Sequence, residues 1–306
     1  MNEEKSEKAY PARFLTDSEL RSYGPPTTFD NTLLSQYEEC PRKFYWFLRG
    51  VLPSEEPIWF VAGRAWQRAL VKWYERPDGE KSERVQECYR EIDNEFSASS
   101  VSLESLHDEK RNPENLKNLF DRYVTEFPSE PWEPLAMEVG FVLPFYQSPW
   151  MLGGALDGYI DWKSQGLFVL ENKTTSSWLN ERYRRQWHRD TQITQYFWAL
   201  RELVENPAGV LMNHASLDIP KRSSTKRELF MRHLEYRSEE QMNQFIHRTF
   251  DLLNGISAEW LKSPAQSFSC HGQMCYGKLA FGPCLYAQLC DSDIPFTELN
   301  PMNYPG

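Results

Sequence analysis

The sequence predicts an α/β protein with a helical N-terminal part, a mixed central sheet flanked by helices, and a cysteine-rich C-terminal segment. Three observations lead to this class. Apolar residues recur at helical spacing before residue 130, and strand-like runs with a hairpin signal follow. Most of the cysteines then gather near the end of the chain.

Helical periodicity covers four early segments, at 31–48, 60–74, 85–96 and 116–127. Asp30 or Asn31 can cap the first of these helices, because both side chains accept hydrogen bonds from free N–H groups. Pro41 should kink or split it, since proline lacks an N–H and clashes with the preceding turn. Residues 1–27 are charged and then proline-rich, and we expect them to form a mobile arm.

Strand-like segments follow at 135–145, 152–162 and 167–174, and the last two read as a hairpin. The rest of the pattern predicts a helix, two strands and a long helix, at 190–203, 209–217, 227–236 and 238–261. We therefore divide the chain into a mobile arm, a helical part, a core and a cysteine segment, at 1–27, 28–130, 131–263 and 264–306.

Composition limits the function classes. The chain has 306 residues, which is enough for a sizeable buried core. It has no apolar run of the ~20 residues that a membrane span needs and no signal-peptide pattern, so we expect a cytoplasmic protein without a membrane partner. The net charge of −10 argues against general nucleic-acid coating but allows a local basic groove. Four arginines are candidates for DNA contact, although alone they could be a solvated surface: Arg182, Arg184, Arg185 and Arg189.

Acidic residues and a lysine lie on the two strands of the predicted hairpin. Glu171 and Lys173 share one face of their strand, because side chains alternate. Asp157 on the preceding strand meets Glu171 only if the hairpin has a bulge or a loop of three or five residues, which we predict. Two adjacent carboxylates need a cation, and Mg²⁺ or Mn²⁺ prefers such oxygen ligands. The alternative is a surface hairpin with an ordinary Glu–Lys pair.

The cysteines point to a second, structural metal site. Clustered cysteines in a reducing compartment indicate metal ligation more often than disulfides. Cys40 lies far upstream of the others, and the C-terminal set is Cys275, Cys284 and Cys290, with Cys270 as a possible replacement for Cys275. The paired Cys-x2-Cys spacing typical of zinc is missing, which favours a 4Fe–4S cluster. Zinc and free cysteines are the alternatives, and Cys88 is expected to be a packing residue.

Several motifs together give a family resemblance. They are Leu34-x2-Tyr37-x2-Cys40-Pro41-Arg42-Lys43-Phe44-Tyr45, Phe60-x2-Gly63-Arg64-Ala65-Trp66-Gln67, Met137-Glu138-Val139, Gly154-x2-Asp157, Glu171-x-Lys173, Gln192-x3-Tyr196 and Cys275-x8-Cys284-x5-Cys290. On these motifs the chain resembles the PD-(D/E)XK nuclease superfamily from about residue 31 to residue 290. The resemblance is to its RecB-like branch with an iron–sulfur cluster, which includes CRISPR adaptation nucleases and phage-encoded exonucleases.

The resemblance implies a restriction-endonuclease-like core and a role for each matching residue. Asp157 and Glu171 would bind the metal with the backbone carbonyl of Asn172, and Lys173 would assist catalysis. Two residues of the following helix, Gln192 and Tyr196, would face the site and the DNA. Glu138 matches a glutamate that often precedes the core strands, and we include it in the metal set. Gln67 occupies a position where many relatives have a metal-binding histidine.

We therefore predict a Mg²⁺- or Mn²⁺-dependent DNA nuclease, acting as an exonuclease on single strands or DNA ends. Its 4Fe–4S cluster would be structural and held by Cys40, Cys275, Cys284 and Cys290. No Walker motif is present, so helicase activity would come from a helicase or recombination partner. The first alternative is a non-catalytic DNA-binding or complex-assembly module, because Gln67 is a weaker metal ligand than histidine. The second is a zinc-stapled structural protein.

Overall fold

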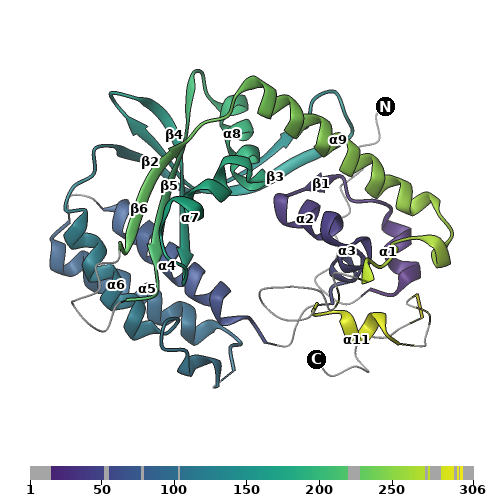
Figure 1. The fold of residues 1–306 in the computed structure, drawn as a ribbon, viewed down its shortest axis with the longest axis horizontal. Coiled ribbons are helices and arrows are strands. Elements are labelled where there is room, and N and C mark those ends of the chain that lie inside the picture. The colour runs from purple at the N-terminus through teal and green to yellow at the C-terminus, as the bar shows by residue number, and fades with distance from the viewer. Residues whose placement is uncertain are drawn as a thin grey trace, which may run out of the picture. The chain divides into compact units, whose positions relative to one another are not determined.

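The computed structural model describes residues 15–51, 55–76, 79–102, 104–219, 228–272, 275, 284–292, 295 and 297–298. The chain folds into two compact units (Figure 1). The first combines Met1–Ser54, Pro144–Gly153 and Ile246–Gly306. The second combines Glu55–Leu143 and Gly154–Phe245. Both units join distant segments of sequence, and the four-part division of the chain stays a prediction.

The first predicted helix is split at proline, as expected. Helix α2 spans Asn31–Glu39 and helix α3 spans Pro41–Leu48. Asp30 caps α2, its side chain accepting from the Leu33 N–H at 2.7 Å. Cys40 between the helices is extended, with φ −165° and ψ 118°, because Pro41 disfavours a helical conformation in the residue before it.

Helix α1 (Asp17–Tyr23) lies in the segment that the sequence predicts as a mobile arm. Thr16 and Glu19 form a capping box at its start. Leu15 and Leu20 are fully buried, so residues 15–27 differ from the prediction. A helix this short offers too few apolar positions for a clear period. Residues 1–14 of the predicted arm lie outside the described part of the chain.

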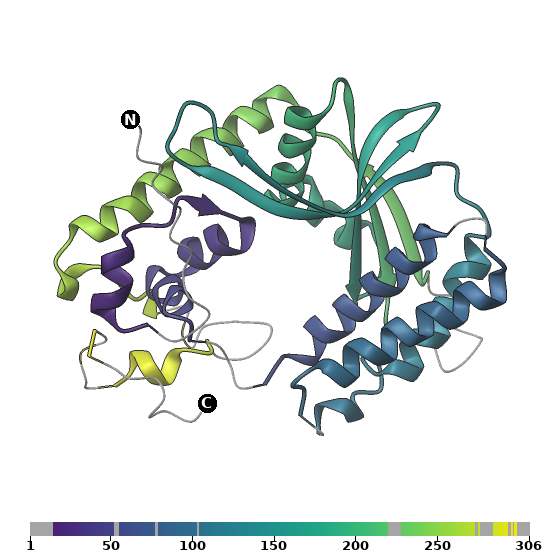
Figure 2. The same cartoon turned by 180° about the vertical axis from the view of Figure 1, so that it is seen from behind.

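The N-terminal helices contact C-terminal residues in the first unit. Strand β1 (Thr28–Phe29) pairs in parallel with the start of β3, and helix α9 spans Glu239–Leu261. Figures 1 and 2 both show α11 (Ala287–Cys290) beside the N-terminal helices. The hydroxyl of Tyr286 donates to the Val51 carbonyl at 2.9 Å, and the rings of Phe44 and Phe268 lie 6.3 Å apart. A short turn, η3 (Pro264–Gln266), follows α9.

Three helices cover one face of the sheet in the second unit (Figures 1 and 2). Helices α4 (Ile58–Glu75), α5 (Lys81–Ala98) and α6 (Pro113–Glu126) contain the predicted helical segments, with the turn η1 (Ser105–His107) before α6. They pack through fully buried side chains, among them Leu70, Phe120 and Cys88. Cys88 is thus a packing residue, as predicted.

The predicted strands are all present and form a mixed sheet. They are β2 (Glu133–Pro144), β3 (Met151–Trp162), β4 (Gly166–Thr175), β5 (Pro207–Ser216) and β6 (Phe230–Glu235). The order is β1-β3-β4-β5-β6, with β2 beside β3. Strands β4 and β5 run parallel, and the β3–β4 and β5–β6 pairs are antiparallel. This α/β fold agrees with the predicted class.

Helix α8 (Thr191–Leu203) connects β4 to β5 and lies on the sheet face opposite α4. A short helix and a turn precede it, α7 (Glu181–Arg185) and η2 (Gln186–Arg189), which the sequence does not predict as helical. Asp190 caps α8, accepting from the Ile193 N–H at 3.0 Å. In the described part of the chain, no helix is long and apolar enough to cross a bilayer.

Candidate active site

The β3–β4 hairpin has a three-residue loop, which is one of the predicted lengths. Trp162 pairs with Gly166, and the ladder continues to Gly158 opposite Leu170. Gly166 has φ +111°, a conformation that a residue with a side chain rarely adopts. Asp157 and Glu171 are the residues that follow the last pair of this ladder, and the charge of Glu171 acts on Asp157, so the two carboxylates lie close together.

Asp157 is held by the backbone of the neighbouring strand. Its Oδ2 accepts a hydrogen bond from the Asn172 N–H at 2.7 Å. Burial, and next the charge of Glu171, raise the pKa of Asp157 well above its usual value, against the opposing effect of Lys173. Gly154 lies three residues before Asp157. Because it has no side chain, the Phe141 ring can pack closely against the β3 backbone there; an added Cβ would lie 2.9 Å from that ring.

Glu171 forms a buried ion pair with Lys173. The Glu171 side chain is 2 % exposed, and its Oε1 lies 2.6 Å from Lys173 Nζ. Its Oε2 is buried and has no hydrogen-bond partner among the described residues. Burial raises the pKa of Glu171 although Lys173 lowers it. Burial lowers the pKa of Lys173, but the charges of Glu171, Asp157 and Asp190 together raise it above its usual value. A buried carboxylate oxygen without a partner fits a site for a hard cation.

Helix α8 also contacts Lys173, through the side chain of Gln192. Lys173 Nζ donates to Gln192 Oε1 at 2.9 Å, and Gln192 Nε2 donates to the Tyr196 hydroxyl at 2.9 Å. Gln192 and Tyr196 are four residues apart, which puts them on one face of the helix. The Trp187 ring centre lies 5.9 Å from Lys173 Nζ. The ammonium group therefore has a defined position beside the two carboxylates.

Gln67 contacts Asp157 directly, and Glu138 acts on it through its charge. Gln67 donates to the Asp157 carbonyl at 3.4 Å and accepts from Asn172 Nδ2 at 2.9 Å, so protein partners occupy both ends of its amide. Glu138 has a left-handed backbone, φ +50°, and its Oε2 lies 2.7 Å from Arg68. Its charge contributes to the raised pKa of Asp157. Their place in the metal set stays a prediction.

The four candidate DNA-binding arginines lie on α7 and η2, the segment whose Trp187 ring centre is 5.9 Å from Lys173 Nζ. Glu181 pairs with Arg184 at 2.9 Å and with Arg185 at 3.2 Å. The other two, Arg182 and Arg189, are exposed. This segment ends next to α8, so it lies at the same side of the sheet as Lys173. Their contact with DNA stays a prediction.

Sequence reasoning missed a buried polar cluster behind this segment. The rings of His214 and His233 stack with centres 5.0 Å apart, on neighbouring strands. Burial, and next His233, lower the pKa of His214 to about 3. Arg237 lies 3.2 Å from Glu235 and donates to the Trp187 carbonyl at 2.8 Å, which anchors η2. No sequence motif predicts this cluster, because its residues come together only through the pairing of the strands.

Five of the six cysteines belong to the first unit, but they do not form a complete ligand set among the described residues. Cys270 Sγ and Cys275 Sγ are 3.4 Å apart, and the Cys284 N–H donates to the Cys275 carbonyl at 2.9 Å. Burial, followed by neighbouring cysteines, raises the thiol pKa of Cys275 and of Cys290 to about 12. Within the described ranges, no group of three or more His, Cys, Asp or Glu side chains is placed to hold a metal ion. The iron–sulfur cluster is therefore not shown.

The mixed sheet flanked by helices is consistent with an α/β nuclease. The chain belongs to the PD-(D/E)XK nuclease superfamily, whose family model matches residues 31–291. Among solved structures it is similar to a candidate exonuclease from Eubacterium rectale, with 12 % sequence identity and a TM-score of 0.41. That similarity covers 78 % of this chain and 84 % of the other. No curated protein matches the sequence significantly.

Proposed function

We propose that this nuclease is a Mg²⁺- or Mn²⁺-dependent DNA exonuclease acting on single strands or DNA ends. One observation supports this most strongly. Glu171 has a buried carboxylate oxygen without a described partner, its other oxygen lies 2.6 Å from Lys173 Nζ, and its charge acts on Asp157. A buried carboxylate oxygen without a hydrogen-bond partner destabilises the folded protein unless a cation or a proton binds to it.

Asp157, Glu171 and the Asn172 carbonyl would hold the divalent ion, with Gln67 and Glu138 at its border. When bound, the ion polarises the scissile phosphate and lowers the pKa of water. Its affinity depends on ionised carboxylates, whose charges repel each other in its absence.

Lys173 would stabilise the negative charge that develops on the phosphate during hydrolysis. Its raised pKa keeps it protonated at neutral pH, and Gln192 and Tyr196 hold it in place. Three exposed arginines would bind the phosphates that flank the scissile bond, Arg182, Arg185 and Arg189.

We further propose that Cys40, Cys275, Cys284 and Cys290 hold a structural 4Fe–4S cluster, with Cys270 as the alternative to Cys275. Support comes from the meeting of cysteines from both chain ends in one unit. Ligation would close a long loop and so remove unfolded-chain entropy. A helicase or recombination partner and a cytoplasmic location are further predictions, from the resemblance and the composition respectively.

The test is cleavage of labelled DNA by the purified full-length protein, anaerobically, with Mg²⁺, Mn²⁺ or EDTA. Linear and circular single strands of one sequence form the matched pair. An exonuclease degrades only the linear strand, whereas cleavage of the circle contradicts exonuclease action. DNA binding without cleavage under either metal would instead support the non-catalytic module.

A further inference from the structure

A row of polar side chains crosses three neighbouring strands beneath the candidate active site. Asn172 on β4 pairs with Asn213 on β5, which pairs with Arg232 on β6. Asn213 Nδ2 donates to Asn172 Oδ1 at 2.7 Å, and Arg232 Nε donates to Asn213 Oδ1 at 3.0 Å. The row lies on the face that α4 and α6 cover, opposite to Glu171 and Lys173.

One end of the row reaches Asp157 by two routes. The Asn172 N–H donates to Asp157 Oδ2 at 2.7 Å. The Asn172 side chain donates to Gln67, whose own amide donates to the Asp157 carbonyl at 3.4 Å. A shift of Asn172 would therefore move both the carboxylate and the backbone of Asp157.

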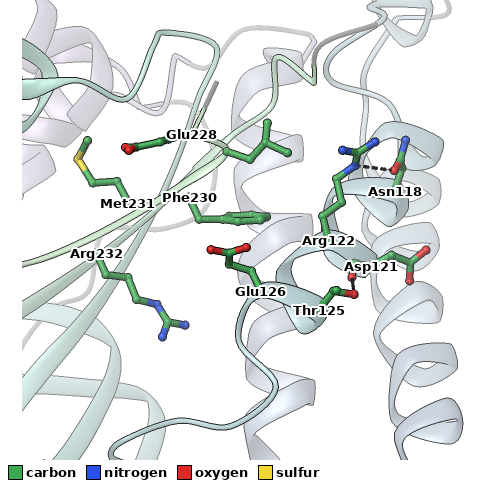
Figure 3. Close-up of a pocket in the computed structure, with 10 residues that line it drawn as sticks. Asn118, Asp121, Arg122, Thr125, Glu126, Glu228, Phe230, Met231 and Arg232 are labelled. Atoms are coloured by element: carbon green, nitrogen blue, oxygen red, sulfur yellow. Dashed lines mark hydrogen bonds between the residues drawn. The ribbon is translucent and has the colours of Figure 1, made fainter. Parts of the chain in front are cut away.

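The other end of the row is fixed by an ion pair. Arg232 NH1 and NH2 donate to the two oxygens of Glu130, at 2.6 and 2.8 Å. The Tyr123 hydroxyl accepts from Arg232 at 2.6 Å and from Asn213 at 2.9 Å. A bidentate Arg–carboxylate pair is rigid as well as strong, so it gives the row a firm anchor. Arg232 also lines an open cavity of about 900 Å³ between α6 and β6 (Figure 3).

Stability alone does not explain these groups. They lie in an otherwise apolar core, where Asn213 is 2 % and Asn172 is 9 % exposed. A buried ion pair gives about as much stability as well-packed apolar side chains, or less. A fully hydrogen-bonded row does, however, define a single arrangement of the residues it joins.

We propose that Asn213 and Arg232 are positioning residues that set the affinity of the active site for its divalent ion. They act through the Asn172 side chain, which holds the β4 backbone so that its N–H fixes Asp157. Loss of such an outer contact weakens metal binding by about 10- to 100-fold. This inference rests on the proposed metal-dependent function of the same site.

The experiment measures Mn²⁺ binding by isothermal titration calorimetry, which needs no catalysis. Asn213→Leu keeps the size of the side chain but removes its hydrogen bonds to Asn172 and Arg232. Arg232→Lys keeps the positive charge but loses the guanidinium group, which bonds to both Glu130 and Asn213. Both variants should raise the Mn²⁺ dissociation constant about 10- to 100-fold. The matched controls are Asn118→Leu and Arg122→Lys, on exposed residues of α6 at the same cavity, and both should bind as wild type.

Cleavage at varied Mn²⁺ concentration gives the second readout. The half-saturating concentration should rise by the same factor, with a smaller change in the maximal rate. Far-UV circular dichroism verifies folding, and Asn172→Ala replaces any variant that does not fold. An unchanged Mn²⁺ dissociation constant in folded variants would overturn the inference. A wild type that binds Mn²⁺ but does not cleave would contradict only the proposed function, and one that binds none would overturn both.

Discussion

The backbone N–H of Asn172 donates to the Asp157 carboxylate at 2.7 Å, while the Asn172 side chain points to the opposite face of the sheet. One residue therefore connects the acidic site on one face to helix α4 on the other. The position of Asp157 depends on how β4 is held in the sheet, and not only on the loop of its own hairpin.

The metal-free protein should lose stability as the pH rises from the usual carboxyl pKa values of 3.8 and 4.5 through the raised pKa values of Asp157 and Glu171. Above the usual values the unfolded state has released protons that the folded state still holds, so the free energy of unfolding decreases with pH. Urea denaturation in EDTA measures this. Asp157→Asn should flatten the dependence, and an identical slope in both proteins would contradict it.

Gln192→Ala should slow cleavage at saturating Mn²⁺ by about 10- to 100-fold, because a hydrogen bond to a charged group contributes about 1.5–3 kcal/mol. Tyr196→Phe, which leaves Gln192 in contact with Lys173, should have a smaller effect of about threefold. Single-turnover kinetics on labelled DNA would measure both. Gln86→Ala, on the exposed surface of α5, is the control, and a loss of the same size there would refute the assigned roles.

Replacing Arg182, Arg185 and Arg189 by alanine should weaken DNA binding and its salt dependence. Three lost phosphate contacts reduce the slope of log affinity against log salt by about 2 for single strands. Fluorescence anisotropy at several salt concentrations gives this slope. The matched triple variant changes Arg76, Arg90 and Arg122, which are also exposed. An equal reduction in both triples would show that only net charge matters.

Anaerobically purified protein should be brown and contain about four iron atoms per chain. Cys40→Ser should lose most of this iron and lower the melting temperature. Cys88→Ala, at a cysteine packed in the core of the second unit, should retain it. Elemental analysis decides the matter, because a colourless wild type with zinc and no iron would contradict the cluster.

Local sequence signals were sufficient for much of the fold. The helices α4 to α6 and α8 have clear apolar periods, and Pro41 splits its helix as expected. The loop length of the β3–β4 hairpin followed from side-chain parity, because Asp157 and Glu171 can share a side only with an odd number of loop residues or a bulge.

Other features depend on contacts that a single segment does not contain. The row Asn172–Asn213–Arg232 and the stacked pair His214–His233 arise from the registers of β4, β5 and β6, which tertiary packing sets. The helices α1 and α7 are too short for a reliable period. Cysteine spacing likewise indicated a metal site but not the arrangement of the thiols.

We propose that Lys173 and the hairpin carboxylates form one catalytic site. The most direct test of this proposal is single-turnover cleavage of linear single-stranded DNA with Mn²⁺ by wild type, Lys173→Ala and Lys163→Ala. Lys163 is the matched control, since it lies in the loop of the same hairpin and is 73 % exposed. We predict a loss of at least about 100-fold for Lys173→Ala and wild-type rates for Lys163→Ala. Wild-type cleavage by folded Lys173→Ala protein would contradict the account.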